Sequence, residues 1–334
     1  MSEIADKKID MLLDCLYSNN KDFSKYWDNA QKLTDKYFGI KRILFNPIYL
    51  SDICLADCPY CGFRVSNKGV SRKTLKPQET IEEARFLINR GVKNILLLAG
   101  DFKHSKYVEM LRQNIISLKR MEDINWLGIE VATLETDEYK ILLDAGANSV
   151  TVFQETYNRN RYDMLHTVTE YKGDYYNRYN AQEKAIKAGF KEVGFGVLYG
   201  VGFWQEDTIA MAEHALQIQD KYPNIHLRFS FPRLQLSNGQ DESCQIEKVT
   251  KQQLQRAITS IRLLFPSASL VLTGRETVDF LVENASVVNV LGYNGSTMVG
   301  GYANNTEGVS QFQLNNRSVF NTFKNKLELH YTLL

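Results

Sequence analysis

The chain has 334 residues, which suits one large domain or two small ones, and a (β/α) barrel routinely needs this many. Its 40 basic and 39 acidic side chains leave a net charge of +1, which argues against a nucleic-acid partner bound through its phosphates. No run of residues reaches the roughly 20 apolar positions that a membrane-spanning helix requires, and no export signal is present. We therefore expect a cytoplasmic protein with no membrane and no nucleic-acid partner.

Residues 1–40 are expected to form an N-terminal helical cap. Apolar side chains recur at helical spacing in this segment, first around Leu12 and Leu16 and again around Ala30 and Leu33. Two helices are therefore predicted before the first strand, which is expected at residues 43–49.

Three of the five cysteines follow this strand directly, because Cys54, Cys58 and Cys61 have the spacing C-x3-C-x2-C. Thiolates hold iron–sulfur clusters, and a cubane needs a ligand at each of its irons. Three cysteines leave one iron without a protein ligand, and an incomplete ligand set is typical of a catalytic site. The spacing therefore predicts a 4Fe-4S cluster, and an exposed cluster would require low-oxygen conditions.

The cysteines have two other interpretations. A structural zinc site needs four ligands, and Cys15 and Cys244 are far away in the sequence. A disulfide between Cys58 and Cys61 would join neighbours that need no linking. A noncatalytic iron–sulfur or zinc-binding interaction module stays open as the alternative to an enzyme.

After the cysteines, short β-rich runs alternate with helical patterns. The expected strands are 43–49, 93–98, 126–132, 149–153, 192–198, 225–230, 269–273 and 287–291, and the expected helices are about 78–90, 106–120, 136–145, 175–188, 206–220, 250–264 and 277–284. Eight strands alternating with helices predict an α/β fold, a parallel TIM-type (β/α) barrel over residues 41–292. Residues 293–334 are expected to be a C-terminal extension that closes the barrel.

Polar residues follow most of the predicted strands. In a (β/α) barrel the carboxyl ends of the strands form one rim, and the active site lies there. The residues that stand at these ends include Gly100, Asp101, Glu130, Gln154, Glu155, Gly200, Ser230, Pro232, Arg275, Tyr293 and Ser296. The sequence therefore predicts an active-site mouth at this rim, independently of the cysteines.

The cysteine motif, with Tyr60 before its last cysteine, is similar to the signature of radical S-adenosylmethionine enzymes. Further segments resemble the aromatic amino-acid lyases of that superfamily: IYLSD, QETY, Asp174-x3-Arg178-x2-Ala181, GVLYG, SFPRL and TGRE. Together they extend from about residue 40 to residue 320. The group contains tyrosine lyases of thiamine biosynthesis and of hydrogenase maturation, and a tryptophan lyase that makes 3-methylindole-2-carboxylate.

The resemblance implies a reaction. The open iron would bind S-adenosylmethionine, and reductive cleavage would give a 5′-deoxyadenosyl radical that takes hydrogen from the substrate's amino nitrogen. Tyrosine lyases then break Cα–Cβ to give 2-iminoacetate (dehydroglycine) and p-cresol, which is the activity we favour, with tryptophan cleavage as the alternative. The implied partners are a flavodoxin- or ferredoxin-type electron donor and a protein that accepts the imine.

The resemblance also implies roles for single residues. Arg275, Gln154 and Glu155 are the expected catalytic residues, and Arg275 is expected to grip the substrate carboxylate. Its competing interpretation is an ion pair with the neighbouring Glu276. The expected cofactor-binding residues are Tyr60, Phe63, Gly100, Asp101, Glu130, Arg178 and Gly200, and the expected substrate-binding residues are Arg275, Ser230, Pro232, Tyr293 and Ser296.

Several positions depart from the tyrosine lyases. Asn158 follows QETY where those enzymes have His, and Gln235-Leu236 follow SFPRL where they have Arg-Pro. The sequence ends at Leu334 without a further cysteine group, which disfavours the hydrogenase-maturation branch and its second cluster. His166 is expected on the surface, and Arg72 and Lys73 are expected to be solvated or to anchor a small anion.

Overall fold

The structure, a computed structural model, describes residues 3–69, 71–102, 106–166, 172–235, 237, 247–292, 295–303, 310–312, 314 and 320–334. Its centre is a parallel sheet of β1 (Lys41–Ser51), β2 (Asn94–Ala99), β3 (Trp126–Glu130), β4 (Ser149–Thr151), β5 (Glu192–Gly196), β6 (His226–Ser230), β7 (Ser269–Leu272) and β8 (Val290–Gly292). Neighbours pair in chain order, and β1 pairs with both β2 and β8. The sheet therefore closes into the predicted barrel, and each predicted strand overlaps an observed one.

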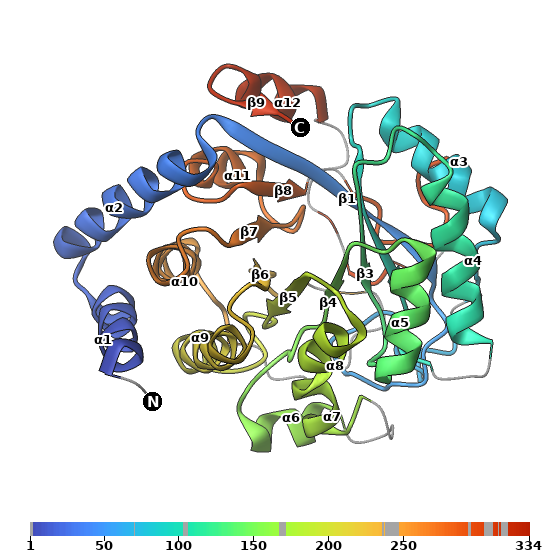
Figure 1. The fold of residues 1–334 in the computed structure, drawn as a ribbon, viewed down its shortest axis with the longest axis horizontal. Coiled ribbons are helices and arrows are strands. Elements are labelled where there is room, and N and C mark those ends of the chain that lie inside the picture. The colour runs from blue at the N-terminus through green and yellow to red at the C-terminus, as the bar shows by residue number, and fades with distance from the viewer. Residues whose placement is uncertain are drawn as a thin grey trace.

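Helices surround the strands as an outer layer (Figure 1). They are α3 (Pro77–Ile88), α4 (Tyr107–Lys119), α5 (Thr136–Ala145), α6 (Arg159–Leu165), α7 (Tyr175–Tyr179), α8 (Ala181–Ala188), α9 (Trp204–Lys221), α10 (Lys251–Leu264) and α11 (Val278–Asn284). The prediction of one helix over 175–188 is wrong, because Asn180, with φ −86° and ψ 2°, separates α7 from α8. Gly146 and Gly189 end α5 and α8 with φ of 113° and 110°, a conformation that glycine adopts without strain.

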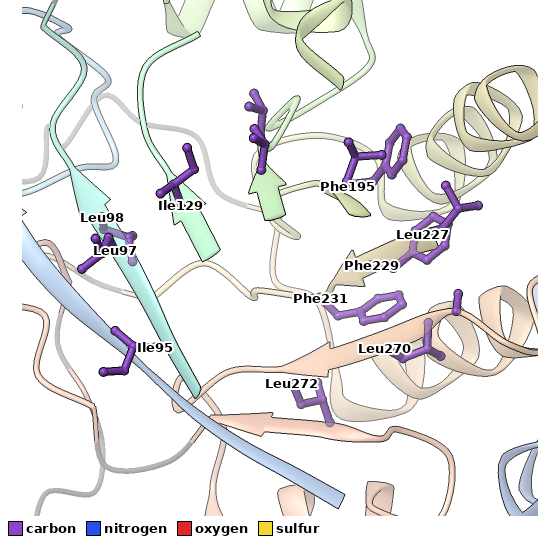
Figure 2. Packing of buried hydrophobic residues seen from close by; sticks show 14 of the residues in the cluster. Ile95, Leu97, Leu98, Ile129, Phe195, Leu227, Phe229, Phe231, Leu270 and Leu272 are labelled. Atoms are coloured by element: carbon purple, nitrogen blue, oxygen red, sulfur yellow. The ribbon is translucent and has the colours of Figure 1, made fainter. Parts of the chain in front are cut away.

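Successive side chains of each strand point alternately into the core beneath the helices and into the interior of the barrel. On β6, Leu227 and Phe229 are buried in the layer beneath the helices, close to Leu270 of β7 (Figure 2), whereas Arg228 and Ser230 line the interior. Removing one such buried leucine typically costs about 2–5 kcal/mol. The outward faces of the strands thus stabilise the fold, and the inward faces are available for binding.

The two predicted N-terminal helices are present as α1 (Glu3–Tyr17) and α2 (Asn20–Phe38). Both pack against α10, and α1 also contacts α9, so the pair lies along the outer helical layer (Figure 1). Arg256 of α10 donates hydrogen bonds to the Cys15 carbonyl and to Ser18 Oγ, which ties the end of α1 to the barrel. Burial raises the pKa of the Cys15 thiol to about 12, as expected for a structural cysteine in the core.

The C-terminal segment adds two elements that the sequence pattern did not predict, α12 (Phe320–Glu328) and β9 (Thr332–Leu333). β9 pairs in parallel with Lys41 and Arg42 at the start of β1, and α12 contacts α11 (Figure 1). The Asn94 side chain donates to the carbonyls of Leu44 and Leu334, so it joins β9 to β2. No helix in the described ranges is long and apolar enough to cross a membrane.

Candidate active site

A cavity of about 170 Å³ occupies the carboxyl-terminal half of the barrel. All eight strands, or the loops that follow them, contribute to its wall, and Cys54, Cys58 and Cys61 lie on it. Ten further predicted site residues line the same cavity: Tyr60, Phe63, Gly100, Asp101, Glu130, Glu155, Arg178, Ser230, Pro232 and Arg275. The fold thus brings together residues that are more than 200 positions apart in the chain.

Three predicted site residues do not line the cavity. Gln154 lies between two lining residues of an extended segment, so its side chain points away, and its Nε2 donates to the Tyr175 carbonyl over 3.4 Å. Ser296 alternates in the same way, and its Oγ accepts a hydrogen bond from the Met298 amide. Gly200 has φ 121° and its carbonyl binds the Glu247 amide. Tyr293 lies outside the described residues.

The loop that carries the cysteines is held by Arg72. Its Nη1 donates to the carbonyls of Asp52 (2.6 Å) and Phe63 (2.8 Å), and its Nη2 donates to that of Arg64 (2.7 Å). These carbonyls stand on both sides of the three cysteines, so one planar guanidinium closes the loop. The expectation that Arg72 is solvated or binds a small anion is wrong, because backbone carbonyls already use its donors.

Replacing Arg72 by glutamine is expected to impair assembly of the cluster site. Each hydrogen bond from a charged donor typically contributes about 1.5–3 kcal/mol, and the side chain of glutamine cannot span the same carbonyls. After anaerobic reconstitution, R72Q should retain less than half of the wild-type iron and sulfide per chain. R90Q is the matched control, since Arg90 is exposed after the end of α3, where its side chain stacks on Phe86 and donates to the Phe86 carbonyl. Equal iron contents in both variants would contradict this role.

The donor set fits a cluster. Burial raises the pKa of Cys54 and Cys58 to about 12 and that of Cys61 to about 11, so the three thiols are protonated at neutral pH until iron displaces the protons. Within the described ranges, no three His, Cys, Asp or Glu side chains converge as a single bound ion would require. A cubane instead takes each thiolate at a separate iron, so Cys54, Cys58 and Cys61 would hold three irons and leave the fourth without a protein ligand.

Gly100 and Asp101 connect the second strand to the cysteine loop. A Cβ atom on Gly100 would lie only 2.1 Å from the Ile53 carbonyl oxygen, so only glycine fits there. The Leu55 amide donates to the Asp101 carbonyl, which holds the loop against β2. Asp101 Oδ1 is buried and has no hydrogen-bond partner among the described residues. A buried carboxylate oxygen that lacks a protein partner fits a cationic group, such as the ammonium of the methionine part of S-adenosylmethionine.

A chain of buried charges crosses the wall beside the cluster loop. Arg178 contacts Asp101 Oδ2 and Glu155 Oε1, each over 3.4 Å, and Lys172 Nζ lies 2.6 Å from the same Glu155 oxygen. Burial alone would raise the pKa of Glu155, but Lys172 and Arg178 outweigh it and hold the pKa at about 2. Glu155 also has φ 68°, which is strained for a residue other than glycine. The ion pairs therefore hold this carboxylate in a fixed, ionised state.

Replacing Glu155 by glutamine should destabilise the protein by about 3–5 kcal/mol, because two buried cations lose their shared partner. Since the pKa of Glu155 is lowered on folding, its stabilisation is present above about pH 4.5 and is lost as the pH falls toward 2. Urea unfolding of the cluster-free protein at pH 7 measures the loss. The control is E183Q, whose ion pairs with Lys187 and Lys221 lie at the surface and should cost less than about 1 kcal/mol. Similar losses for both variants would contradict the account.

His166 is buried, so the expectation of a surface histidine is wrong. Its Nδ1 lies 3.0 Å from the Tyr162 carbonyl, which can only accept, and its Nε2 lies 2.8 Å from Tyr60 Oη. Nδ1 therefore carries the proton, and the Tyr60 hydroxyl donates to Nε2. Burial and the nearby Lys172 lower the pKa of His166 to about 3, so the ring is neutral. His166 thus fixes the aromatic ring that precedes the last cysteine.

Arg275 stands on the opposite wall, after β7. The alternative interpretation, that Arg275 forms an ion pair with Glu276, is wrong because Glu276 pairs with Arg233. Arg233 Nε lies 2.8 Å from Glu276 Oε1, and Arg233 Nη2 also contacts the carboxylate. Within the described part of the chain, Arg275 makes no ion pair, and its guanidinium stacks 3.5 Å from the centre of the Phe312 ring. Burial lowers the pKa of Arg275, while the negative charge of Glu130 opposes this shift. Arg275 Nη1 donates to the Arg233 carbonyl over 3.4 Å, so the cavity wall holds a guanidinium that has a carbonyl partner but no carboxylate among the described residues.

The cavity wall also includes residues that were not among the predicted site residues, notably Lys172, Gln311, Phe312 and Thr273. Lys172 lies between motifs, and Gln311 and Phe312 come from the C-terminal extension. Gln311 joins that extension to the cysteine loop, because its carbonyl accepts from the Gly62 amide and its Oε1 accepts from Tyr49 Oη over 2.6 Å. Of these residues, Thr273 was the one that a sequence motif could have identified, because it is the first residue of the TGRE segment. Its buried Oγ1 has no hydrogen-bond partner among the described residues.

The fold and the site define a (β/α)-barrel enzyme whose cluster would be held by three cysteines at the mouth. Residues 48–215 match the Radical SAM superfamily. The chain is 33% identical over 286 residues to the 2-iminoacetate synthase of Escherichia coli (strain K12). This aligned region covers 85% of this chain and 74% of that protein. The chain therefore belongs to the radical S-adenosylmethionine superfamily, within the aromatic amino-acid lyase group.

Solved structures agree with this assignment. The FeFe-hydrogenase maturase HydG from Carboxydothermus hydrogenoformans superposes with a TM-score of 0.90 and 26% identity, over 98% of this chain and 75% of that one. Methylornithine synthase shares the fold, with a TM-score of 0.71 at 21% identity. The chain is thus a lyase that uses a 4Fe-4S cluster and S-adenosylmethionine, and the alternative of a noncatalytic binding module is wrong.

Proposed function

We propose that this enzyme cleaves the Cα–Cβ bond of free L-tyrosine to give 2-iminoacetate and p-cresol. The observation that carries the proposal is Arg275, a partly buried arginine on the cavity wall whose guanidinium has no ion-pair partner among the described residues. A planar guanidinium binds a carboxylate through two parallel hydrogen bonds, and a free amino acid offers that carboxylate. The 33% identity to a 2-iminoacetate synthase supports the choice of tyrosine.

The bound cluster and S-adenosylmethionine would supply a 5′-deoxyadenosyl radical in this cavity. The protein has to hold the substrate nitrogen close to that radical, because a radical attacks whatever lies nearest. Arg275 would fix the carboxylate, and stacking on Phe312 limits the movement of its guanidinium. Asp101 and Arg178 would bind the charged methionine part on the opposite wall. Aliphatic and aromatic residues of the cavity wall, such as Leu98, would surround the substrate's aromatic side chain.

The reaction also requires other molecules. A flavodoxin- or ferredoxin-type protein would supply the electron, and a partner protein would accept 2-iminoacetate, which is an unstable imine. The exposed side chains of Ile53 and Leu55 flank Cys54 at the surface, and this is where we place electron entry.

Tryptophan cleavage is the second candidate, and the two departures from the tyrosine lyases differ in weight. Asn158 caps α6, with its side chain accepting from the Arg161 amide, and it does not line the cavity. Gln235 does line the cavity, and its Nε2 donates to the Arg275 carbonyl over 3.2 Å. The position of Gln235 on the cavity wall therefore keeps tryptophan as an alternative substrate. Leu236 lies outside the described residues.

The test is an anaerobic incubation of the reconstituted, dithionite-reduced enzyme with S-adenosylmethionine and either amino acid. The proposal expects 5′-deoxyadenosine and p-cresol in equal amounts from L-tyrosine. Indole products from L-tryptophan without p-cresol from L-tyrosine would overturn it in favour of the second candidate. The absence of amino-acid-dependent 5′-deoxyadenosine with either substrate would overturn both.

A further inference from the structure

Glu130 is the last residue of β3, and its side chain lines the cavity. It makes no hydrogen bond or ion pair within 4 Å that involves the described residues, although it lies in a strongly charged site. The other carboxylates of the same wall are occupied: Glu155 binds Lys172 and Arg178, and Asp101 binds Arg178. Glu130 is thus the one described cavity carboxylate whose side chain has no protein partner.

Glu130 ends β3 and Arg275 lies in the loop after β7, so the two residues line the cavity from different sides of the barrel. Each shifts the pKa of the other, so they are electrostatically close, but they do not form an ion pair. An unpaired cation and an unpaired anion in one cavity are complementary to a zwitterion. A free α-amino acid is a zwitterion of this kind, with a carboxylate for Arg275 and an ammonium for Glu130.

We propose that Glu130 binds the substrate's α-ammonium group and acts as the general base that converts it to the neutral amine. The inference deepens the proposed function and rests on it, since it assumes a free amino acid whose nitrogen loses a hydrogen atom. The step moves one proton from nitrogen to a Glu130 carboxylate oxygen. It leaves a neutral amine with its lone pair and a neutral carboxylic acid, and no electrons are exchanged. This assignment replaces the cofactor-binding role expected for Glu130 from the resemblance.

The need for a base follows from the chemistry of the substrate. An α-amino group has a pKa of about 8 or above, so it is mostly protonated at neutral pH. A cationic nitrogen has no lone pair to stabilise an adjacent radical centre, whereas the amine has one. Burial and the like charge of Glu155 raise the pKa of Glu130 to about 7, opposed by Arg275, Arg178 and Lys172. A base of this strength is well matched to operation near neutral pH.

The test compares wild type with E130Q, which keeps the size of the side chain but cannot accept a proton, and E130D, which keeps the carboxylate. E122Q is the control, because Glu122 is exposed on the loop before β3. For the wild type, kcat/KM should rise with pH to a plateau with an apparent pKa of about 7. E130Q should lose about 10²- to 10⁴-fold at pH 7 and recover steadily toward pH 9, as solvent deprotonates the substrate. E130D should keep the wild-type form of the profile at a lower rate.

Two further readouts separate the possible outcomes. S-adenosylmethionine should change the electron paramagnetic resonance spectrum of the reduced cluster equally in E130Q and wild type, and E130Q should melt at a temperature no lower than that of wild type. Loss of that spectral change in E130Q would return Glu130 to the cofactor site and overturn the proposal. So would a pH profile of E130Q parallel to that of wild type. The assay uses whichever amino acid the wild type consumes. If the wild type does not cleave tyrosine but cleaves another amino acid, the proposed substrate is wrong, and the role of Glu130 can still be tested with that amino acid.

Discussion

Replacing Cys58 by alanine should abolish formation of 5′-deoxyadenosine. Two thiolates cannot hold a cubane in the geometry that leaves one iron open, so C58A should bind neither a complete cluster nor S-adenosylmethionine. Cys58 is buried, so the loss of this ligand cannot be compensated by solvent. The measurement is 5′-deoxyadenosine formed by the reduced protein, together with iron and sulfide per chain.

The control is C15A, which removes a cysteine that is equally buried but belongs to α1, outside the cavity. C15A should keep the full cluster and normal 5′-deoxyadenosine formation, with at most a loss of stability from the small cavity that it creates. If C58A kept a complete cluster, or if C15A lost it, the assignment of the three cluster ligands would be wrong.

Replacing Arg275 by glutamine should reduce kcat/KM for the amino acid by about 30- to 5,000-fold, because losing one partner of a buried charge pair costs about 2–5 kcal/mol. R275K should recover little of this loss, since an ammonium cannot make the two parallel bonds of a guanidinium. Cleavage of S-adenosylmethionine in the absence of substrate should stay near the wild-type rate. The signature is therefore 5′-deoxyadenosine that forms without an equal amount of p-cresol.

R112Q is the matched control, because Arg112 of α4 lies outside the cavity and its ion pair with Glu109 is at the surface. It should leave both products unchanged. If R275Q bound and cleaved the amino acid like R112Q, the carboxylate clamp would have to lie elsewhere on the cavity wall, and the main support for an amino-acid substrate would be lost.

The barrel could be predicted because the signals that specify it are local. Alternation of short apolar runs with helical patterns gave each strand, and the polar residues that follow them gave the rim. Arg275 and Glu130 were identified in this way, and both line the cavity. The same reasoning failed at Gln154, because the alternation of an extended segment decides which of two neighbouring residues faces inward.

Long-range contacts could not be predicted from the sequence. Arg72 has no motif of its own, and its role depends on carbonyls on both sides of the cysteines. Burial of His166 depends on its contact with Tyr60, more than 100 residues earlier in the chain. The pairing of β9 with β1 joins the C-terminal segment to the first strand through backbone hydrogen bonds, which carry no side-chain signature. Such contacts exist only in the folded chain.

The most direct test of the account is the origin of the hydrogen atom that enters 5′-deoxyadenosine. The amino hydrogens of tyrosine exchange with water, so in D₂O the substrate nitrogen carries deuterium. The account predicts deuterium in 5′-deoxyadenosine from reactions in D₂O with L-tyrosine, and none from L-tyrosine deuterated on carbon in H₂O. Deuterium transferred from a carbon position, with none from D₂O, would contradict it.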